Sequence, residues 1–274
     1  MLFALIVAEQ KLVAGASIER VGETFSSSET IALSGDDTLL LRDCRLMPSV
    51  VITVSGTLNC CGKTVLITGT VFEDRSQLVV GIQEAHNATV TVQGSVFHGA
   101  SALQFGTTLP SMSRFHYRNH STIRVDNNSL SNSRASIRVG NLHLSDRSSV
   151  EVVGLVGNAM GPPSAVLDFR FNILRSQSNI LIESSVIVSS STTSTAAPIY
   201  VRQTSLNESS QLVVKNTSLT GAIQAMEFAL LSLSGFGTSF HVLRSVISCV
   251  STTGTCEAVK LAAANVDDFA SMLF

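Results

Sequence analysis

The sequence predicts an all-β protein, a single-domain right-handed parallel β-helix of about eight coils, each 25–33 residues long. Three observations lead to this prediction. A pattern of apolar residues recurs eight times along the 274 residues, a turn-forming residue follows at a fixed place in seven of the eight copies, and the polar residues are mostly serine and threonine. A repeat period of roughly 20–50 residues is typical of solenoids and propellers.

Each copy of the pattern has two apolar residues separated by one residue, with a third apolar residue five positions later. Alternation of this kind over a short run indicates a strand with one buried face. Gly157 is the one departure from the pattern. The copies are Leu39/Leu41/Leu46, Val65/Ile67/Phe72, Val90/Val92/Phe97, Ile123/Val125/Leu130, Val150/Val152/Gly157, Ile180/Ile182/Ile187, Leu212/Val214/Leu219 and Phe240/Val242/Ile247.

A second apolar pair precedes each copy, and a further apolar residue lies between the two pairs in several copies. About three short strands per repeat are therefore expected, which suits a triangular coil. Parallel crossovers are right-handed in nearly all proteins, which sets the expected handedness. The pairs are Ile31/Leu33, Ile52/Val54, Leu78/Val80, Leu103/Phe105, Ile137/Val139, Leu167/Phe169, Ile199/Val201 and Met226/Phe228, and the single residues are Leu144, Leu174, Leu206 and Leu233.

Two residues after the apolar pair within each eight-residue copy lies a column in which seven of the eight residues are turn formers. Glycine and asparagine adopt left-handed backbone angles at little or no steric cost. The column therefore predicts a corner at which the chain leaves one sheet for the next. Its members are Asp43, Gly69, Gly94, Asn127, Gly154, Ser184, Asn216 and Arg244.

The repeats divide the chain into three segments. Residues 1–29 are expected to form an N-terminal leader or cap, and residues 30–256 the β-helix. Residues 257–274 carry apolar side chains at near-helical spacing, so the tail is a candidate helix that caps the open end of the solenoid. The stretch from Gly106 to Ser121 is the longest interruption of the repeat and is expected to project as a loop.

Composition limits the classes of partner. Only 14% of the residues are charged and the formal net charge is −2, so the chain lacks the basic surface that nucleic acid attracts. The apolar run Leu2–Ala8 is either a secretion signal or a first strand. No segment approaches the roughly 20 apolar residues of a membrane-spanning helix, and no membrane span is expected in this chain.

Leucine-rich repeats are the rival solenoid. The run from Ile123 to Leu130 fits their strand-and-asparagine core. The asparagine is missing from most other copies, and no repeat has a long helical half, so the β-helix is preferred.

No catalytic, metal-binding or cofactor-binding residue is predicted. Glycosidases need two carboxylates roughly 5–9 Å apart, but adjacent pairs such as Asp36 and Asp37 point to opposite faces of a strand. The His116-x-x-x-His120 spacing binds metal on a helix, and here it falls in the expected loop. Cys60-Cys61 has no accompanying histidine and is explained as small residues at a corner.

Five N-x-S/T sequons and one cysteine pair are candidate sites of covalent modification. Asn87, Asn119 and Asn207 are expected in accessible turns and are the stronger glycosylation candidates. Asn127 and Asn216 are weaker candidates, because turn chemistry already explains them. Cys249 and Cys256 would close a loop disulfide in a secreted chain.

The repeats TLLLRDCRL, TVTVQGSVF and QLVVKNTSLTGAIQAMEFALLSLSGFGTSFHVLRSVI resemble those of the dispersed-gene-family and related membrane-associated surface proteins of kinetoplastids. The resemblance covers about Thr30 to Cys249 and implies a pectin-lyase-like β-helix ectodomain that is exposed at the cell surface, glycosylated and adhesive. It implies no catalytic residue. The family's proteins are much longer and usually end in membrane spans, which this chain lacks.

The sequence thus favours a non-enzymatic cell-surface or secreted module that binds glycans or surface proteins. One alternative is a polysaccharide lyase or glycoside hydrolase of pectin-lyase-like fold, with a groove beside the Gly106–Ser121 loop and Asp126 and Asp168 as its carboxylates. A leucine-rich-repeat-like interaction solenoid is the other.

Overall fold

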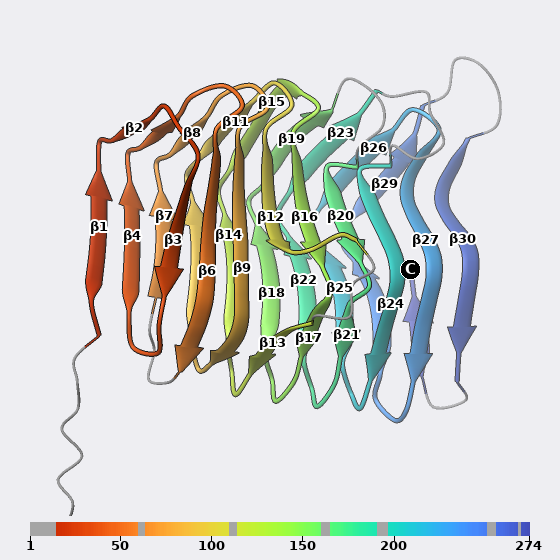
Figure 1. The fold of residues 1–274 in the computed structure, drawn as a ribbon. Coiled ribbons are helices and arrows are strands. Elements are labelled where there is room, and N and C mark those ends of the chain that lie inside the picture. The colour runs from red at the N-terminus through yellow and green to blue at the C-terminus, as the bar shows by residue number, and fades with distance from the viewer. Residues whose placement is uncertain are drawn as a thin grey trace, which may run out of the picture.

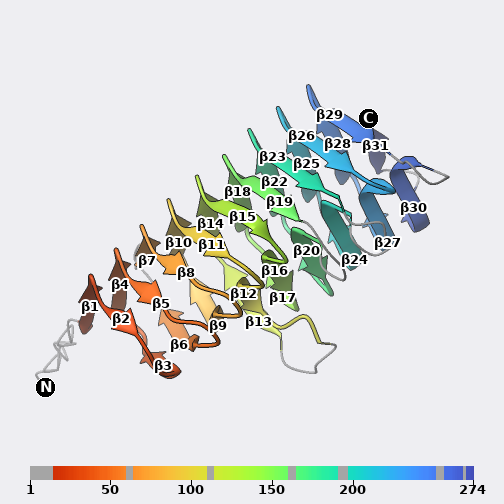
Figure 2. The ribbon, with the colours of Figure 1, turned by 90° about the horizontal axis from the view of Figure 1, so that it is seen from above.

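A computed structural model describes residues 15–59, 64–109, 114–159, 165–190, 197–250, 256–267 and 270–274. All the regular structure in these residues is β-strand, and the strands form a right-handed parallel β-helix, as predicted. The coils follow one another along a single axis from the N-terminal to the C-terminal end (Figures 1 and 2).

Three parallel sheets run the length of the solenoid. Sheet A contains, in spatial order, β1 (Ser17–Val21), β4 (Thr38–Arg42), β7 (Thr64–Thr68), β10 (Thr89–Gln93), β14 (Thr122–Asp126), β18 (Ser149–Val153), β22 (Asn179–Glu183), β25 (Gln211–Lys215), β28 (Ser239–Leu243) and β31 (Ser271–Leu273). Sheet B contains β2 (Thr24–Phe25), β5 (Arg45–Leu46), β8 (Val71–Phe72), β11 (Val96–His98), β15 (Ser129–Ser133), β19 (Val156–Ala159), β23 (Val186–Ser189), β26 (Ser218–Gly221) and β29 (Val246–Cys249).

Sheet C is formed by the longest strands and by pairs of short strands separated by a bend. It contains β3 (Glu29–Leu33), β6 (Val51–Asn59), β9 (Gln77–His86), β12 (Ala102–Gly106), β13 (Phe115–Arg118), β16 (Ser136–Gly140), β17 (Leu142–Leu144), β20 (Leu167–Arg170), β21 (Ile173–Leu174), β24 (Ile199–Asn207), β27 (Gln224–Ser234) and β30 (Glu257–Val266).

The apolar pattern of the sequence forms the core as stacked columns. In sheet A the strands pair in register, so that Ile123 lies beside Val90 on one side and Val150 on the other. These three side chains are fully buried. Each buried side chain of this size stabilises the fold by roughly 1.5–3 kcal/mol. Because one coil alone could not cover these side chains, stability comes from stacking.

The predicted corner between sheets A and B is confirmed. Every member of the turn-forming column has a positive φ, from Asp43 at 54° to Arg244 at 49°. The following residue points inward and is often hydroxylic. Buried Ser95 accepts a hydrogen bond on Oγ from the Thr70 N–H of the previous coil, and its own N–H donates to Asn128 Oδ1 at 2.9 Å. These hydrogen bonds satisfy backbone groups that the corner takes out of the sheets.

Gly157 occupies an apolar position of the repeat because of its neighbour Val166. A Cβ added to Gly157 would lie 2.9 Å from Val166 Cγ1, which is fully buried. Val166 precedes β20. It fills the space that is taken in other coils by the larger residue at the position of Gly157.

The segment boundaries differ from those predicted. Ser17–Val21 and Thr24–Phe25 already form β1 and β2, so the β-helix begins within the expected leader. Sheet B, which takes one strand from each coil, has nine strands, and the coil count therefore differs slightly from the predicted eight.

The C-terminal tail forms strands where a capping helix was expected. Glu257–Val266 is β30, which pairs in parallel with β27, and Ser271–Leu273 is β31, which pairs with β28. The open edges of β27 and β28 offer N–H and C=O groups, and pairing with them satisfies the backbone of the tail.

The expected loop from Gly106 to Ser121 is shorter than predicted. The chain returns to sheet C as β13, where Tyr117 pairs with Leu144 and is fully buried. Leucine-rich repeats would alternate strands with a helical or extended half, and the three-sheet coil rules out that alternative. No helix among the described residues is long and apolar enough to cross a membrane.

Candidate functional site

The corner between sheets C and A is built from the same tight turn in successive coils. Its two central residues both have positive φ, with values of 56° and 65° at Asp146 and Arg147. The N–H of Ser148 closes the turn onto the carbonyl oxygen of Ser145. Positive φ at both central residues is the geometry of a type I′ turn. The equivalent pairs are Asn119/His120 (53° and 64°), Ser176/Gln177 (53° and 63°) and Glu208/Ser209 (54° and 62°).

Hydrogen bonds between coils hold these turns in line. The N–H of His120 donates to the carbonyl oxygen of Asp146, and that of Arg147 to the carbonyl oxygen of Ser176, both at 2.9 Å. Left-handed backbone at a residue other than glycine costs of order 1–3 kcal/mol. The regular hydrogen bonds offset part of that cost and fix the direction of the outward side chains.

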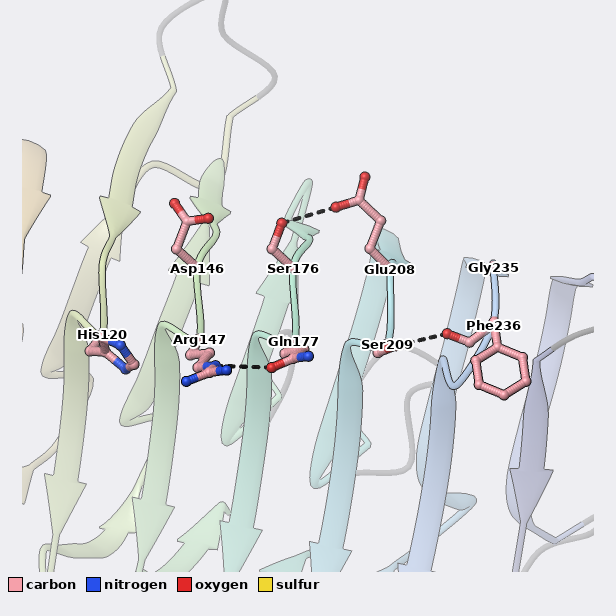
Figure 3. A pocket seen from close by; sticks show the side chains of 9 residues that line it. All are labelled: His120, Asp146, Arg147, Ser176, Gln177, Glu208, Ser209, Gly235 and Phe236. Atoms are coloured by element: carbon pink, nitrogen blue, oxygen red, sulfur yellow. Dashed lines mark hydrogen bonds between the residues drawn. The ribbon is translucent and has the colours of Figure 1, made fainter.

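These turns line a shallow open groove of about 620 Å³ (Figure 3). We call it the corner groove. Its lining residues are His120, Asp146, Arg147, Ser176, Gln177, Glu208, Ser209, Gly235 and Phe236. They come from five successive coils, and neighbouring parallel strands lie about 4.8 Å apart. The corner groove therefore follows the solenoid axis.

The side chains of the groove form two rows (Figure 3). The first turn residues, Asp146, Ser176 and Glu208, make a row rich in oxygen acceptors. The second turn residues make a row that includes the donors Arg147 and Gln177. A ligand lying between the rows would meet acceptors on one side and mainly donors on the other.

Neighbouring side chains within each row are hydrogen-bonded. Arg147 Nε donates to Gln177 Oε1 and Ser176 Oγ donates to Glu208 Oε2, both at 2.9 Å. These contacts order long, exposed side chains and lower the entropy lost when a ligand binds.

An exposed aromatic ring lies at one end of the groove. Phe236 is 82% exposed and lies between Gly235 and Gly237, whose φ angles are 88° and 72°. Ser209 Oγ donates to the carbonyl oxygen of Phe236 at 2.9 Å and fixes the backbone of this turn. The exposed ring of Phe236 therefore offers an apolar surface for ligand contact at this end of the groove.

Three of the five sequons lie at this same corner. Asn87 and Asn119 are exposed and have positive φ, and Asn207 is half-buried and accepts a hydrogen bond from Ser234 Oγ. Asn127 and Asn216 are exposed at the corner between sheets A and B. Glycosylation of all five stays a prediction.

The cysteines are placed as follows. Cys249 and Cys256 are joined by a disulfide with a Cα–Cα distance of 5.8 Å, and Cys44 is a free, buried thiol. Burial raises the pKa of the Cys44 thiol. Cys60 and Cys61 lie outside the described residues.

The two histidines of the His116-x-x-x-His120 pattern lie in different surroundings. His116 lies on β13 beside His143, with ring centroids 5.1 Å apart, whereas His120 lines the corner groove. Burial lowers the pKa of both His116 and His143, with neighbouring positive charge as a further cause. No group of three candidate metal ligands occurs among the described residues.

Asp126 and Asp168, the carboxylates of the hydrolase alternative, do not converge. Asp126 ends β14 in sheet A, and Asp168 lies in sheet C, where its carboxylate accepts a hydrogen bond from Arg170 Nε at 2.6 Å. The structure thus gives no paired carboxylate site from these two residues.

The sequence predictions missed the corner groove. The signal that could have located it is the buried serine that closes each turn, at Ser121, Ser148, Ser178 and Ser210. Two polar residues precede each of these serines. Comparisons with models of protein families, with curated proteins and with solved structures found no match to this chain.

Proposed function

We propose that this protein is a non-enzymatic cell-surface or secreted β-helix module that binds neutral glycan chains along the corner groove. The observation that carries the proposal is the repetition of one polar turn over successive coils, which presents hydrogen-bonding side chains at a regular spacing of about 4.8 Å. An extended polysaccharide presents its hydroxyl groups with a similar repeat.

The two rows of the groove match the chemistry of a sugar. Each sugar hydroxyl both donates and accepts a hydrogen bond, so it can bridge an acceptor such as Glu208 and a donor such as Gln177. Phe236 adds an apolar platform, because the negative face of an aromatic ring attracts the C–H groups of a pyranose ring. A few placed polar groups beside an aromatic side chain are typical of ligand sites.

The proposed location outside the cytosol is supported by the covalent chemistry. Disulfides persist mainly in oxidising compartments, and Cys249 is bonded to Cys256. The exposed sequons Asn87 and Asn119 are compatible with a secretory route.

The test is retention of the purified chain on neutral oligosaccharides, with new reducing ends recorded in the same samples. The protein should come from a host that does not glycosylate, because sugars on Asn119 or Asn207 would border the groove. Cellohexaose, xylohexaose and mannohexaose serve as neutral probes. Binding without new chain ends is expected, and release of new ends would overturn the non-enzymatic proposal.

Variants locate the binding to the groove. Phe236→Ala and Glu208→Ala should each weaken binding about tenfold, the size typical of a central contact. Val246→Ala is the matched control, because Val246 is also an exposed apolar side chain, at 64%, and lies on sheet B. Equal losses in Phe236→Ala and Val246→Ala, or no retention on any neutral probe, would rule out this function for the groove.

A further inference from the structure

A second polar cluster lies on the outer face of sheet C. Arg138 on β16, Asp168 on β20 and Tyr200 on β24 are register partners on adjacent strands. Two residues further along the same strands, Arg170 lies beside Arg202. The residues that alternate with them, such as Val139 and Phe169, are buried in the core. The cluster therefore faces away from the core on three neighbouring coils.

Two of the arginines are anchored in the same way. Arg138 Nε donates to Ser136 Oγ at 3.0 Å, and Arg170 Nε donates to Asp168 Oδ1 at 2.6 Å. In each case the acceptor is two residues earlier on the same strand and the same face. Arg170 also makes a cation–π contact, because its guanidinium carbon lies over the ring of Tyr200, 5.3 Å from the ring centroid.

This anchoring leaves the terminal nitrogens of both guanidinium groups for a ligand. Arginine carries five N–H donors, and Nε accounts for one of them. Among the described residues, the terminal nitrogens of Arg138 and Arg170 have no hydrogen-bond partner. Side chains held in place before binding lose less entropy when they bind.

The cluster has an excess of positive charge that the rest of the chain does not share. Arg138, Arg170 and Arg202 lie on three neighbouring strands with the carboxylate of Asp168, which gives +3 − 1 = +2, whereas the whole chain carries −2. Glu227, the register partner of Tyr200 on the next strand, forms its own ion pair with Lys260. Partial burial lowers the pKa of Arg138, and Asp168 opposes this shift. A partly desolvated cation without its own counter-ion is stabilised by a bound anion.

We propose that Arg138 and Arg170 form a binding site for an oxyanion, a carboxylate or sulfate group, carried by an acidic oligosaccharide. A planar guanidinium fork matches a carboxylate or sulfate with two parallel hydrogen bonds. Tyr200 flanks the site and holds the guanidinium group of Arg170 over its ring. This site is separate from the corner groove and does not depend on the function proposed for it.

The test is calorimetric titration of the full chain with three probes of matched length. A galacturonate hexamer supplies carboxylates, a sulfated dextran hexamer supplies sulfates, and the uncharged dextran hexamer supplies neither. Binding of at least one anionic probe, without binding of the uncharged dextran at this site, is expected. The two anionic arms decide which oxyanion is preferred.

Substitutions assign the binding to the anchored arginines. Arg138→Gln should weaken binding of the anionic probe about tenfold or more, because a hydrogen bond between charged groups is lost. Arg170→Lys keeps a cation beside Asp168 and removes the fork, so it should also weaken binding while the fold is preserved. Arg75→Gln, which removes one exposed positive charge at a distant turn, should leave affinity within about twofold.

Three outcomes would overturn the proposal. They are no binding of either anionic probe, equal binding of the uncharged dextran by the Glu208→Ala variant, in which the corner groove is weakened, or equal losses in Arg138→Gln and Arg75→Gln. Glu208→Ala, which alters only the corner groove, should leave the anionic titration unchanged, so failure at one site is distinguishable from failure at the other.

Discussion

Replacement of Gly157 by alanine tests the packing of the coil at the one position where the apolar pattern fails. The repeat pattern alone would favour a larger apolar residue there. In the structure, the added Cβ would lie 2.9 Å from Val166 Cγ1 and 3.7 Å from Ile187 Cγ2. The first distance is shorter than a normal van der Waals contact, and Val166 is β-branched and fully buried, so it has little freedom to move.

The expected change has two opposing parts. Overpacking of a filled core costs about 1–3 kcal/mol. The φ of Gly157 is not positive, so alanine gains about 0.4–1 kcal/mol from the smaller entropy of the unfolded chain. Gly157→Ala should therefore lower the free energy of unfolding by about 1 kcal/mol.

Val166→Ala separates the two parts in a double-mutant cycle. Without the valine methyl groups the clash disappears, and Gly157→Ala should stabilise the Val166→Ala background by about 0.4–1 kcal/mol. The coupling between the two substitutions then equals the overpacking cost of about 1–3 kcal/mol. Urea unfolding followed by circular dichroism measures all four proteins, and unchanged slopes confirm that they unfold alike. Stabilisation by Gly157→Ala in the wild-type background, or coupling below about 0.5 kcal/mol, would refute the packing argument.

Three further predictions concern the core, the histidines and the disulfide. Ile182→Asp places a carboxylate in a fully buried column and should unfold the chain cooperatively, so a folded, protease-resistant variant would contradict the column. Burial lowers the pKa of His116 and His143, so the unfolded chain binds protons more readily than the folded chain. The free energy of unfolding should therefore fall as the pH drops below about 6.5. His143→Gln should make this loss smaller, as measured by denaturant titrations at pH 7.5 and 5.5. Reduction of the Cys249–Cys256 disulfide, with a sequence separation of 7, should destabilise the last coils by about 2 kcal/mol, and faster amide hydrogen exchange confined to β29 and β30 would report it.

Periodicity located most of the core and one corner correctly. The column from Asp43 to Arg244 was predicted because a left-handed corner restricts residue type more strongly than an exposed strand does. The apolar columns of sheet A were predicted because half-buried strands require a two-residue alternation.

The tail shows where periodicity failed. Its run Leu261 to Val266 includes three consecutive alanines, which fit a helix or a strand. Only the open edge of β27, which the tail pairs with, selects the strand. The same reason explains why β1 was missed, since its pairing with β4 is a contact between coils.

The two proposed sites could not be found by spacing along the chain. Asp146 and Glu208 carry ordinary turn chemistry, and Arg138 and Arg170 alternate with core residues on ordinary strands. Their roles depend on neighbours one coil away, which are about thirty residues distant in the sequence.

The sequence by itself determined the solenoid, because burial of alternate side chains and the left-handed corner are local requirements that every coil repeats. Only the tertiary structure decided the ends, the space at Gly157 and the alignment of polar side chains on the outer surface. Those features depend on the register between coils, and hydrogen bonding between parallel strands fixes that register in three dimensions.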